Sequence, residues 1–158
     1  LALGADVPVF VHGRAAWGEG VGDRLTPLDL PEPAFLLVRP DATVSTAEVF
    51  KAPELTRDSP AIRLPGLLLT SGRNDCEPVV RRRFPAVAEA LDWLGQFAPA
   101  RLTGTGSCVF AVMPSDEAAR AALDRLPARW SGHVVRGLNR SPLTGRLELE
   151  RGLPESGR

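Results

Sequence analysis

A glycine-rich turn is the segment of this chain best suited to chemistry. Gly104, Thr105 and Gly106 lie just before the strand-like apolar run 108–112. Glycine permits positive φ angles and close approach of the backbone, and successive main-chain N–H groups can form a concave site for an anion such as phosphate. A hairpin turn built of small residues is the alternative, because a lone Gly-x-Gly is a weak signal.

An aspartate near the start of the chain is a second candidate. Asp6 lies between Gly4 and the apolar segment 7–10, which contains Pro8 and is expected to form a strand. A positioned carboxylate can accept the proton of an attacking hydroxyl group, and this contributes typically about 10²- to 10⁴-fold to a rate. A turn-forming or helix-capping aspartate is the alternative.

Four segments together carry a resemblance to a known superfamily. They are GADVPVF at 4–10, VSTAEVFK at 44–51, NDCE at 74–77 and LTGTGSCVFAV at 102–112. In this order they resemble the later half of GHMP kinases, named for galacto-, homoserine, mevalonate and phosphomevalonate kinases. Within the superfamily, they resemble the branch that acts on 4-diphosphocytidyl-2-C-methyl-D-erythritol. The family's early phosphate loop and catalytic lysine are not found here, so we interpret the chain as a truncated piece of a longer enzyme.

The resemblance gives each candidate residue a role. It implies that Asp6 is the base that accepts a proton from the substrate hydroxyl group. It places the loop of Gly104, Thr105 and Gly106 beside the active cleft, where the loop either lines the phosphate region of the substrate or only supports the catalytic elements.

Thr46 and Phe50 match the cytidine side of the family's site. There an aromatic ring stacks on cytosine and a nearby hydroxyl group helps to orient the base. Stacking of a base on an aromatic ring contributes about 1–3 kcal/mol. A phenylalanine buried in the core is the alternative for Phe50.

The implied reaction is ATP-dependent phosphorylation of the 2-hydroxyl group of 4-diphosphocytidyl-2-C-methyl-D-erythritol, in non-mevalonate isoprenoid synthesis. ATP and Mg²⁺ are the implied cofactors, with Mg²⁺ as the counter-charge to the phosphates. Without the phosphate loop, we expect the fragment alone to be inactive. Another GHMP kinase of small molecules and a non-enzymatic ferredoxin-like binding module are the alternatives.

Composition excludes several other classes of protein. The 158 residues include 19 Lys and Arg and 19 Asp and Glu, so there is no broad basic field for nucleic acid. Cys76 and Cys108 cannot build a disulfide scaffold, and with His12 and His133 they show no paired metal-ligand spacing. We therefore expect no metal site in this chain. No apolar run approaches the roughly 18 residues that span a membrane, so we expect no membrane partner and a cytoplasmic location. The sequence does not determine the oligomeric state.

The pattern of apolar residues predicts an α+β fold. The pattern is close to a ferredoxin-like fold, and the resemblance implies the same fold for a C-terminal domain at 31–143, after a remnant of the N-terminal kinase domain at 1–30. We expect a mobile tail at 144–158. The expected helices, on one face of the sheet, are 46–51, a short one within 60–70, one from residue 74 with an Asn74–Glu77 capping box and a break at Pro85, and one from Ser115 to Leu126. The expected strands are two over 7–28, a central one at 34–38 covered on both faces, one within 102–113 and one near 133–135.

Overall fold

The computed structural model describes residue 4, residues 6–60 and residues 72–152. The chain divides into two units. One comprises Leu1–Glu32 with Gly137–Arg158, and the other comprises Pro33–Arg136. The short helix expected within residues 60–70 lies almost wholly outside the described residues. Among the helices of the described part, none combines the length and apolar character needed to cross a membrane.

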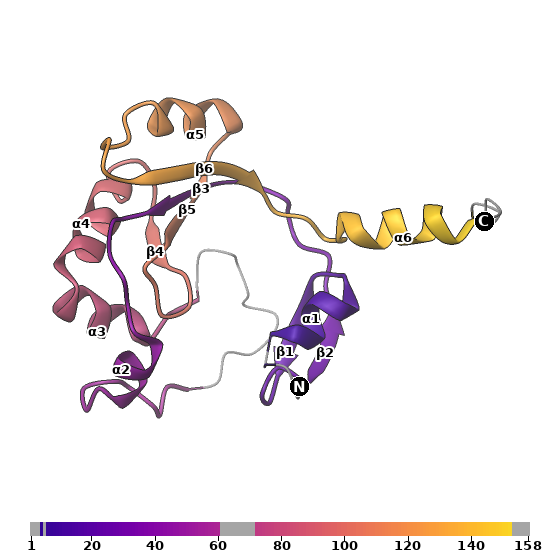
Figure 1. Cartoon of the computed structure of the whole chain (residues 1–158), viewed down its shortest axis with the longest axis horizontal. Coiled ribbons are helices and arrows are strands. Elements are labelled where there is room, and N and C mark those ends of the chain that lie inside the picture. The colour runs from indigo at the N-terminus through magenta and orange to yellow at the C-terminus, as the bar shows by residue number, and fades with distance from the viewer. Residues whose placement is uncertain (1–3, 5, 61–71, 153–158) are drawn as a thin grey trace, which may run out of the picture. The chain divides into compact units, whose positions relative to one another are not determined.

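The unit Pro33–Arg136 is built on a four-stranded antiparallel sheet. Its strands are β3 (Ala34–Arg39), β4 (Ala100–Leu102), β5 (Val109–Met113) and β6 (Ser131–Arg136), in the spatial order β4-β5-β3-β6 (Figure 1). Helices connect β3 to β4 and β5 to β6, whereas a short loop joins β4 to β5. This is the βαββαβ order of a ferredoxin-like fold. The predicted α+β class and the central position of the strand at 34–38 are therefore confirmed.

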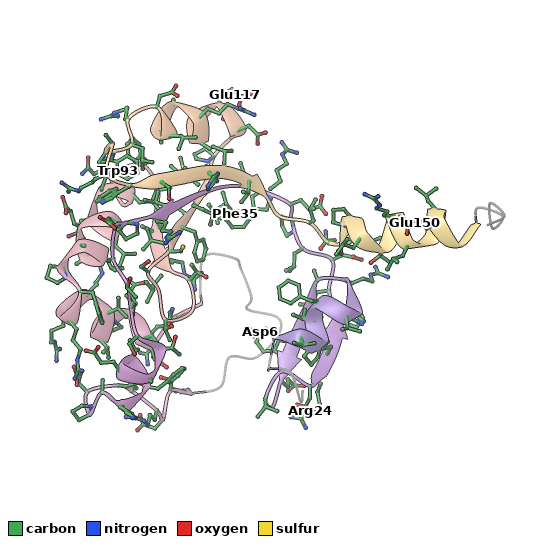
Figure 2. All side chains as sticks on the ribbon, in the orientation of Figure 1. Asp6, Arg24, Phe35, Trp93, Glu117 and Glu150 are labelled. Carbon is green, nitrogen blue, oxygen red and sulfur yellow. The ribbon has the colours of Figure 1, made fainter. Side chains whose placement is uncertain are left out.

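Only one face of the central strand is fully buried. Burial alternates along β3, and buried Leu36 pairs in register with buried Ala111 of β5. The helices α4 (Pro85–Leu94) and α5 (Asp116–Leu123) pack against the sheet in the same hydrophobic core. The prediction that both faces of this strand are covered was wrong. On the other face lies half-buried Phe35, labelled in Figure 2. Its ring centroid is 6.1 Å from that of Phe110.

Two helices begin at serines, as the sequence predicted for Ser115. The Oγ of Ser115 accepts a hydrogen bond from the N–H of Ala118 at 3.1 Å at the start of α5. The Oγ of Ser45 accepts one from the N–H of Glu48 at 3.3 Å at the start of α2 (Thr46–Lys51). These bonds satisfy main-chain donors that have no partner within the helix. The helix α5 ends at Leu123, before its predicted end at residue 126.

The break predicted at Pro85 is present. The helix α3 (Cys76–Arg83) ends there, and Phe84 has φ −125° and ψ 83°, because proline disfavours helical geometry in the residue before it. The predicted capping box is wrong. Asn74 Oδ1 accepts from the N–H of Cys76 at 3.0 Å, but the Glu77 carboxylate bonds to a different segment, described below.

The other unit contains the helix α1 (Val7–His12), the hairpin of β1 (Ala16–Glu19) and β2 (Arg24–Pro27), and the helix α6 (Pro142–Gly152). The strand expected over residues 7–10 is wrong, because these residues open α1. Pro8 lies in the first turn, where a missing N–H costs no helical bond. Gly13 ends the helix with φ 67°, and a Cβ there would lie 2.5 Å from Thr144 Oγ1.

The helix α6 was not predicted. The sequence after residue 143 has no sustained helical periodicity, and Leu143, Leu147 and Leu149 are all exposed. An ion pair between Arg146 and Glu150, with Nε and Oε1 3.1 Å apart, links successive turns and contributes about 0.3–0.5 kcal/mol. The predicted mobility of residues 144–158 stays a prediction.

Candidate functional site

The turn between β4 and β5, residues 103–107, is named the glycine loop here. Gly104 has φ 55° and Gly106 has φ 88°, a region that disfavours other residue types. A Cβ on Gly104 would meet nothing within 4 Å, whereas one on Gly106 would lie 3.0 Å from Leu102 Cδ1. Backbone conformation alone therefore favours glycine at 104, and both conformation and space favour it at 106.

The structure brings the glycine loop to the start of α2. The hydroxyl groups of Thr46 and Thr105 share a hydrogen bond of 2.9 Å between their Oγ1 atoms, although 59 positions separate them in the sequence. Two of the segments singled out from the sequence are thus neighbours, and each contributes a hydroxyl group to the same place.

Phe50 lies one turn further along α2 and is 56% exposed. The alternative that this ring belongs to the core therefore does not hold. Arg57 fixes the backbone at this end of the helix, since its Nη2 donates to the carbonyl oxygens of Phe50 at 2.7 Å and Ala52 at 3.1 Å. The Phe50 ring is therefore an exposed flat surface on α2, and the end of this helix is held by Arg57.

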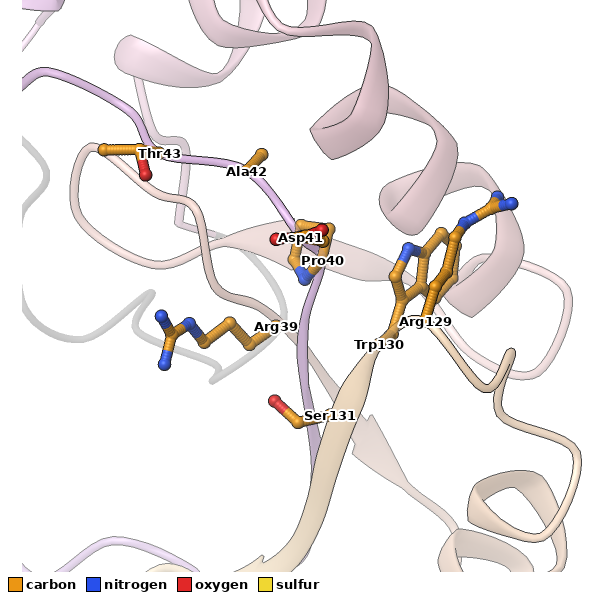
Figure 3. Close-up of a pocket in the computed structure, with 8 residues that line it drawn as sticks. All are labelled: Arg39, Pro40, Asp41, Ala42, Thr43, Arg129, Trp130 and Ser131. Atoms are coloured by element: carbon orange, nitrogen blue, oxygen red, sulfur yellow. The ribbon is translucent and has the colours of Figure 1, made fainter.

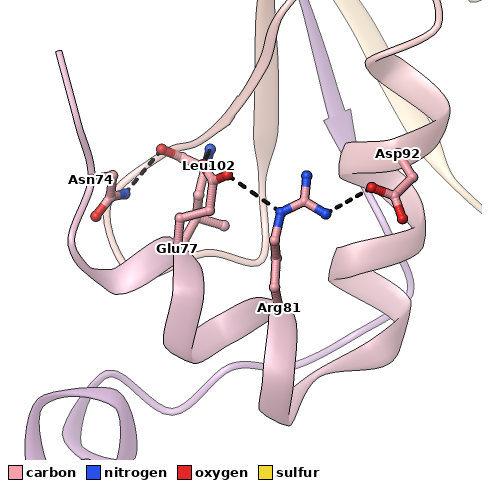
Figure 4. A network of polar contacts seen from close by, with 5 residues as sticks. All are labelled: Asn74, Glu77, Arg81, Asp92 and Leu102. Carbon is pink, nitrogen blue, oxygen red and sulfur yellow. Dashed lines mark hydrogen bonds and ion pairs between the residues drawn. The ribbon is translucent and has the colours of Figure 1, made fainter. Parts of the chain in front are cut away.

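Side chains at and just before the start of α3 also hold the glycine loop and its base (Figure 4). Asn74 Nδ2 donates to the carbonyl oxygens of Leu102 at 3.0 Å and Gly104 at 2.7 Å. Glu77 Oε2 accepts from the N–H of Leu102 at 2.9 Å. From the sequence, we assigned these two residues no role beyond the capping box. The only sequence feature that pointed to Asn74 and Glu77 as part of the site was their place in the segment 74–77, which resembles the GHMP kinases.

Asp75 joins the chain on either side of residues 61–71. Its Oδ2 accepts from Ser59 Oγ at 2.6 Å, and its Oδ1 accepts from Arg73 Nε at 2.7 Å. The hydrogen bond from Ser59 is the main cause that lowers the pKa of the Asp75 carboxyl group, and the bond and charge of Arg73 add to it. Asp75 is therefore ionised at neutral pH.

Asp6 lies in the unit of α1. Figure 2 shows it at the start of that helix, where it occupies the N-cap position with φ −84° and ψ −13°. Its side chain is exposed and makes no capping hydrogen bond, although the residue lies in a turn at the start of the helix. The carboxylate is thus not engaged by the helix that it precedes. The catalytic role of Asp6 stays a prediction.

A pocket of about 270 Å³ lies where β3 ends and β6 begins (Figure 3). The side chains of Arg39 and Arg129 point apart in it, and Asp41 adds a negative charge. Arg129 is already paired with Glu89, and its guanidinium lies 5.3 Å from the ring centroid of Trp130. The two arginines therefore do not form a joint anion clamp, and the site residues predicted from the sequence are not among those that line the pocket.

Metal-binding groups are not gathered in the part of the chain that the structure describes. Within residues 4, 6–60 and 72–152, no cluster of three or more His, Cys, Asp or Glu side chains could hold a metal ion. Cys76 and Cys108 are free. Burial, and then the charge of Asp75, raise the pKa of the Cys76 thiol, so it stays protonated and is a poor ligand at neutral pH.

Comparisons with known proteins identify the domain. The family described as "GHMP kinases C terminal" matches residues 56–132, which include α3 to α5 and the glycine loop. The chain carries a GHMP kinase C-terminal domain. A solved structure titled as a crystal structure of 4-(cytidine 5'-diphospho)-2C-methyl-D-erythritol kinase is 27% identical, with a TM-score of 0.74 over 85% of this chain and 54% of that one.

Two curated relatives of this GHMP kinase domain share much more of its sequence. The protein named 4-diphosphocytidyl-2-C-methyl-D-erythritol kinase from Halorhodospira halophila is 60% identical over 147 residues, which cover 90% of this chain and 51% of the relative. The protein of the same name from Alkalilimnicola ehrlichii is 60% identical over 150 residues, which cover 95% of this chain and 52% of the relative. The chain thus spans about half the length of the curated relatives that it matches.

Proposed function

We propose that this chain supplies the substrate-binding part of a kinase that transfers the γ-phosphoryl group of ATP to the 2-hydroxyl group of 4-diphosphocytidyl-2-C-methyl-D-erythritol. The observation that carries the proposal is the 60% identity to two kinases of that name over at least 90% of this chain. We also expect the enzyme to work in the cytoplasm and to serve non-mevalonate isoprenoid synthesis.

The cytidine end of the substrate would bind at α2. Phe50 offers an exposed ring on which cytosine can stack, and Thr46 offers a hydroxyl group in the same helix. Thr46 is also bonded to Thr105, so the base and the glycine loop would be held at one place. The positive φ angles of Gly104 and Gly106 suit a loop whose N–H groups face the diphosphate of the substrate.

Asp6 would accept the proton of the 2-hydroxyl group as that oxygen attacks the γ-phosphorus. An alcohol is a weak nucleophile, so removal of its proton by a free carboxylate assists the attack. Mg²⁺ bound to ATP would neutralise charge on the phosphates. The described residues gather no ligand cluster for it, so none of them is assigned to the metal.

A chimera tests the proposal. This chain would replace the matching part of the Halorhodospira halophila kinase, and phosphorylation would be followed with labelled ATP. We expect the chimera to phosphorylate the cytidine-bearing substrate but not galactose, homoserine or mevalonate. The chain alone should be inactive, because phosphoryl transfer depends on positioning and electrostatic stabilisation by a phosphate loop that this sequence lacks.

Each outcome has a distinct meaning. A folded chimera without kinase activity would contradict the proposed function and favour a binding module. Preference for one of the other three substrates would place the chain elsewhere among the GHMP kinases. Activity of the chain alone would contradict the division of roles.

A further inference from the structure

The end of β4 is held by side chains instead of by another strand. Among the strands of the described residues, β4 lies at the edge of the sheet and pairs with β5. An edge strand leaves N–H and C=O groups unpaired on its outer side. At Leu102, where β4 ends, the N–H donates to Glu77 and the C=O accepts from Asn74. Both main-chain groups of the residue before the glycine loop are thus fixed, one by Glu77 of α3 and the other by Asn74, just before that helix.

The Glu77 carboxylate is itself held. Arg81, one turn further along α3, donates from Nε to Glu77 Oε1 at 3.4 Å and from Nη1 to Asp92 of α4 at 2.7 Å. The hydrogen bond that Arg81 donates to Asp92 is the main cause that raises the pKa of the Arg81 guanidinium. Asp92, Arg81 and Glu77 therefore form a chain of ion pairs (Figure 4). Glu77, at its end, bonds to the backbone N–H of Leu102.

Asn74 uses both ends of its amide group. Its Nδ2 donates to two carbonyl oxygens, and its Oδ1 accepts from the N–H of Cys76, so the side chain cannot rotate without losing bonds. An aspartate of the same shape keeps the acceptor but has no donors at neutral pH. It would also place a negative charge against the oxygens of Leu102 and Gly104.

We propose that Asn74 and Glu77 are positioning residues for substrate binding. They fix Leu102 and Gly104 so that the glycine loop stays rigid beside α2, with Thr105 against Thr46. Thr103 and Gly106 use their N–H groups in main-chain bonds of the turn, and the remaining N–H groups of the loop would face the diphosphate of the substrate. This inference rests on the function proposed for the loop. Both residues act through the backbone at the base of the loop, to which their side chains bond.

Asn74→Asp is the decisive variant. In the chimera, we expect kcat/KM for the cytidine-bearing substrate to fall by about 10²-fold, because a displacement of about 1 Å at a binding site can cost that much. The KM for ATP should stay close to that of the unmodified chimera. In the chain itself, amide hydrogen exchange should become faster at residues 103–107 and not across β3 and α5.

Glu77 provides a second, graded test. Glu77→Gln keeps an oxygen for the N–H of Leu102 but loses the charge that faces Arg81, whereas Glu77→Ala loses both. We expect the glutamine variant to retain most of the substrate affinity that the alanine variant loses. The matched control is Glu54→Gln, which makes the same change in another ion pair of α3, with Arg83 at 2.8 Å and 2.9 Å.

The outcomes separate a positioning role from a structural one. If Asn74→Asp and Glu77→Ala lower only the melting temperature, as Glu54→Gln would, and leave substrate KM and loop exchange unchanged, the proposal is overturned. Equal loss of affinity in the glutamine and alanine variants of Glu77 would also contradict it. If the unmodified chimera is inactive, the proposed function fails, and hydrogen exchange in the chain still decides whether Asn74 and Glu77 hold the loop.

Discussion

Replacing Phe50 with alanine tests the cytidine end of the site. If the ring stacks on cytosine, its loss removes about 1–3 kcal/mol of binding free energy, which corresponds to a rise of about 5- to 150-fold in Kd. The affinity for an ATP analogue should not change. Phe50→Tyr keeps a flat ring and should bind cytidine diphosphate about as well as the unmodified protein.

The cost in stability follows from the exposure of the ring. Replacement of a fully buried phenylalanine by alanine lowers the free energy of unfolding of a protein by about 3–5 kcal/mol. Phe50 is 56% exposed, so less than half of its surface contributes. Alanine also favours the helical conformation of α2 by about half a kcal/mol. We therefore expect the free energy of unfolding to fall by only about 1 kcal/mol.

Calorimetric titration of the chimera with cytidine diphosphate and with an ATP analogue, together with thermal melting, provides the measurement. A variant that melts normally and binds cytidine diphosphate unchanged would refute stacking on Phe50. Equal weakening of both ligands, with a large fall in melting temperature, would instead assign the ring to packing.

Three further changes test separate parts of the site. Asp6→Asn in the chimera should lower kcat by about 10²-fold or more with a small change in substrate KM, and turnover near normal would give Asp6 a structural role. Gly104→Val should cost about 1–3 kcal/mol of unfolding free energy, through its φ of 55° and not through a clash, and an unchanged melting curve would disprove that strain. Asp75→Asn should lower stability by a constant amount at neutral pH. Because its folded-state pKa is lowered, the difference should shrink as the pH falls below about 4, and denaturation across pH 2–7 would detect a difference that grows instead.

The fold of the unit Pro33–Arg136 could be predicted because its signals are local. Apolar runs gave the strands, Ser115 gave a helix start, and Pro85 gave a break. The prediction of a strand from Val7 was wrong because alternating valines suit a strand as well as a helix. Pro8 is compatible with both a strand and the first turn of a helix. The decisive feature, the left-handed backbone at Gly13, belongs to the end of the helix and not to its start.

The contacts of the site were harder to predict than its residues. The bond between Thr46 and Thr105 exists only because α2 lies near the β4–β5 turn, and no local pattern encodes that proximity. Asn74 and Glu77 matched a helix start in sequence. Their bonds to Leu102 depend on β4 being the edge strand, which follows from sheet order alone.

The same contacts bear on the choice between an ordinary hairpin turn and a binding loop. The glycine loop does connect two antiparallel strands, so by connectivity it is a hairpin. A turn whose only task is to reverse the chain needs no support beyond its own main-chain bonds. Here α3 holds the base of the loop through Asn74 and Glu77, and α2 holds Thr105 near its tip. The space beside Gly104 is nevertheless open. Support of the loop at its base and near its tip, with open space beside Gly104, favours a loop that is kept rigid for a ligand.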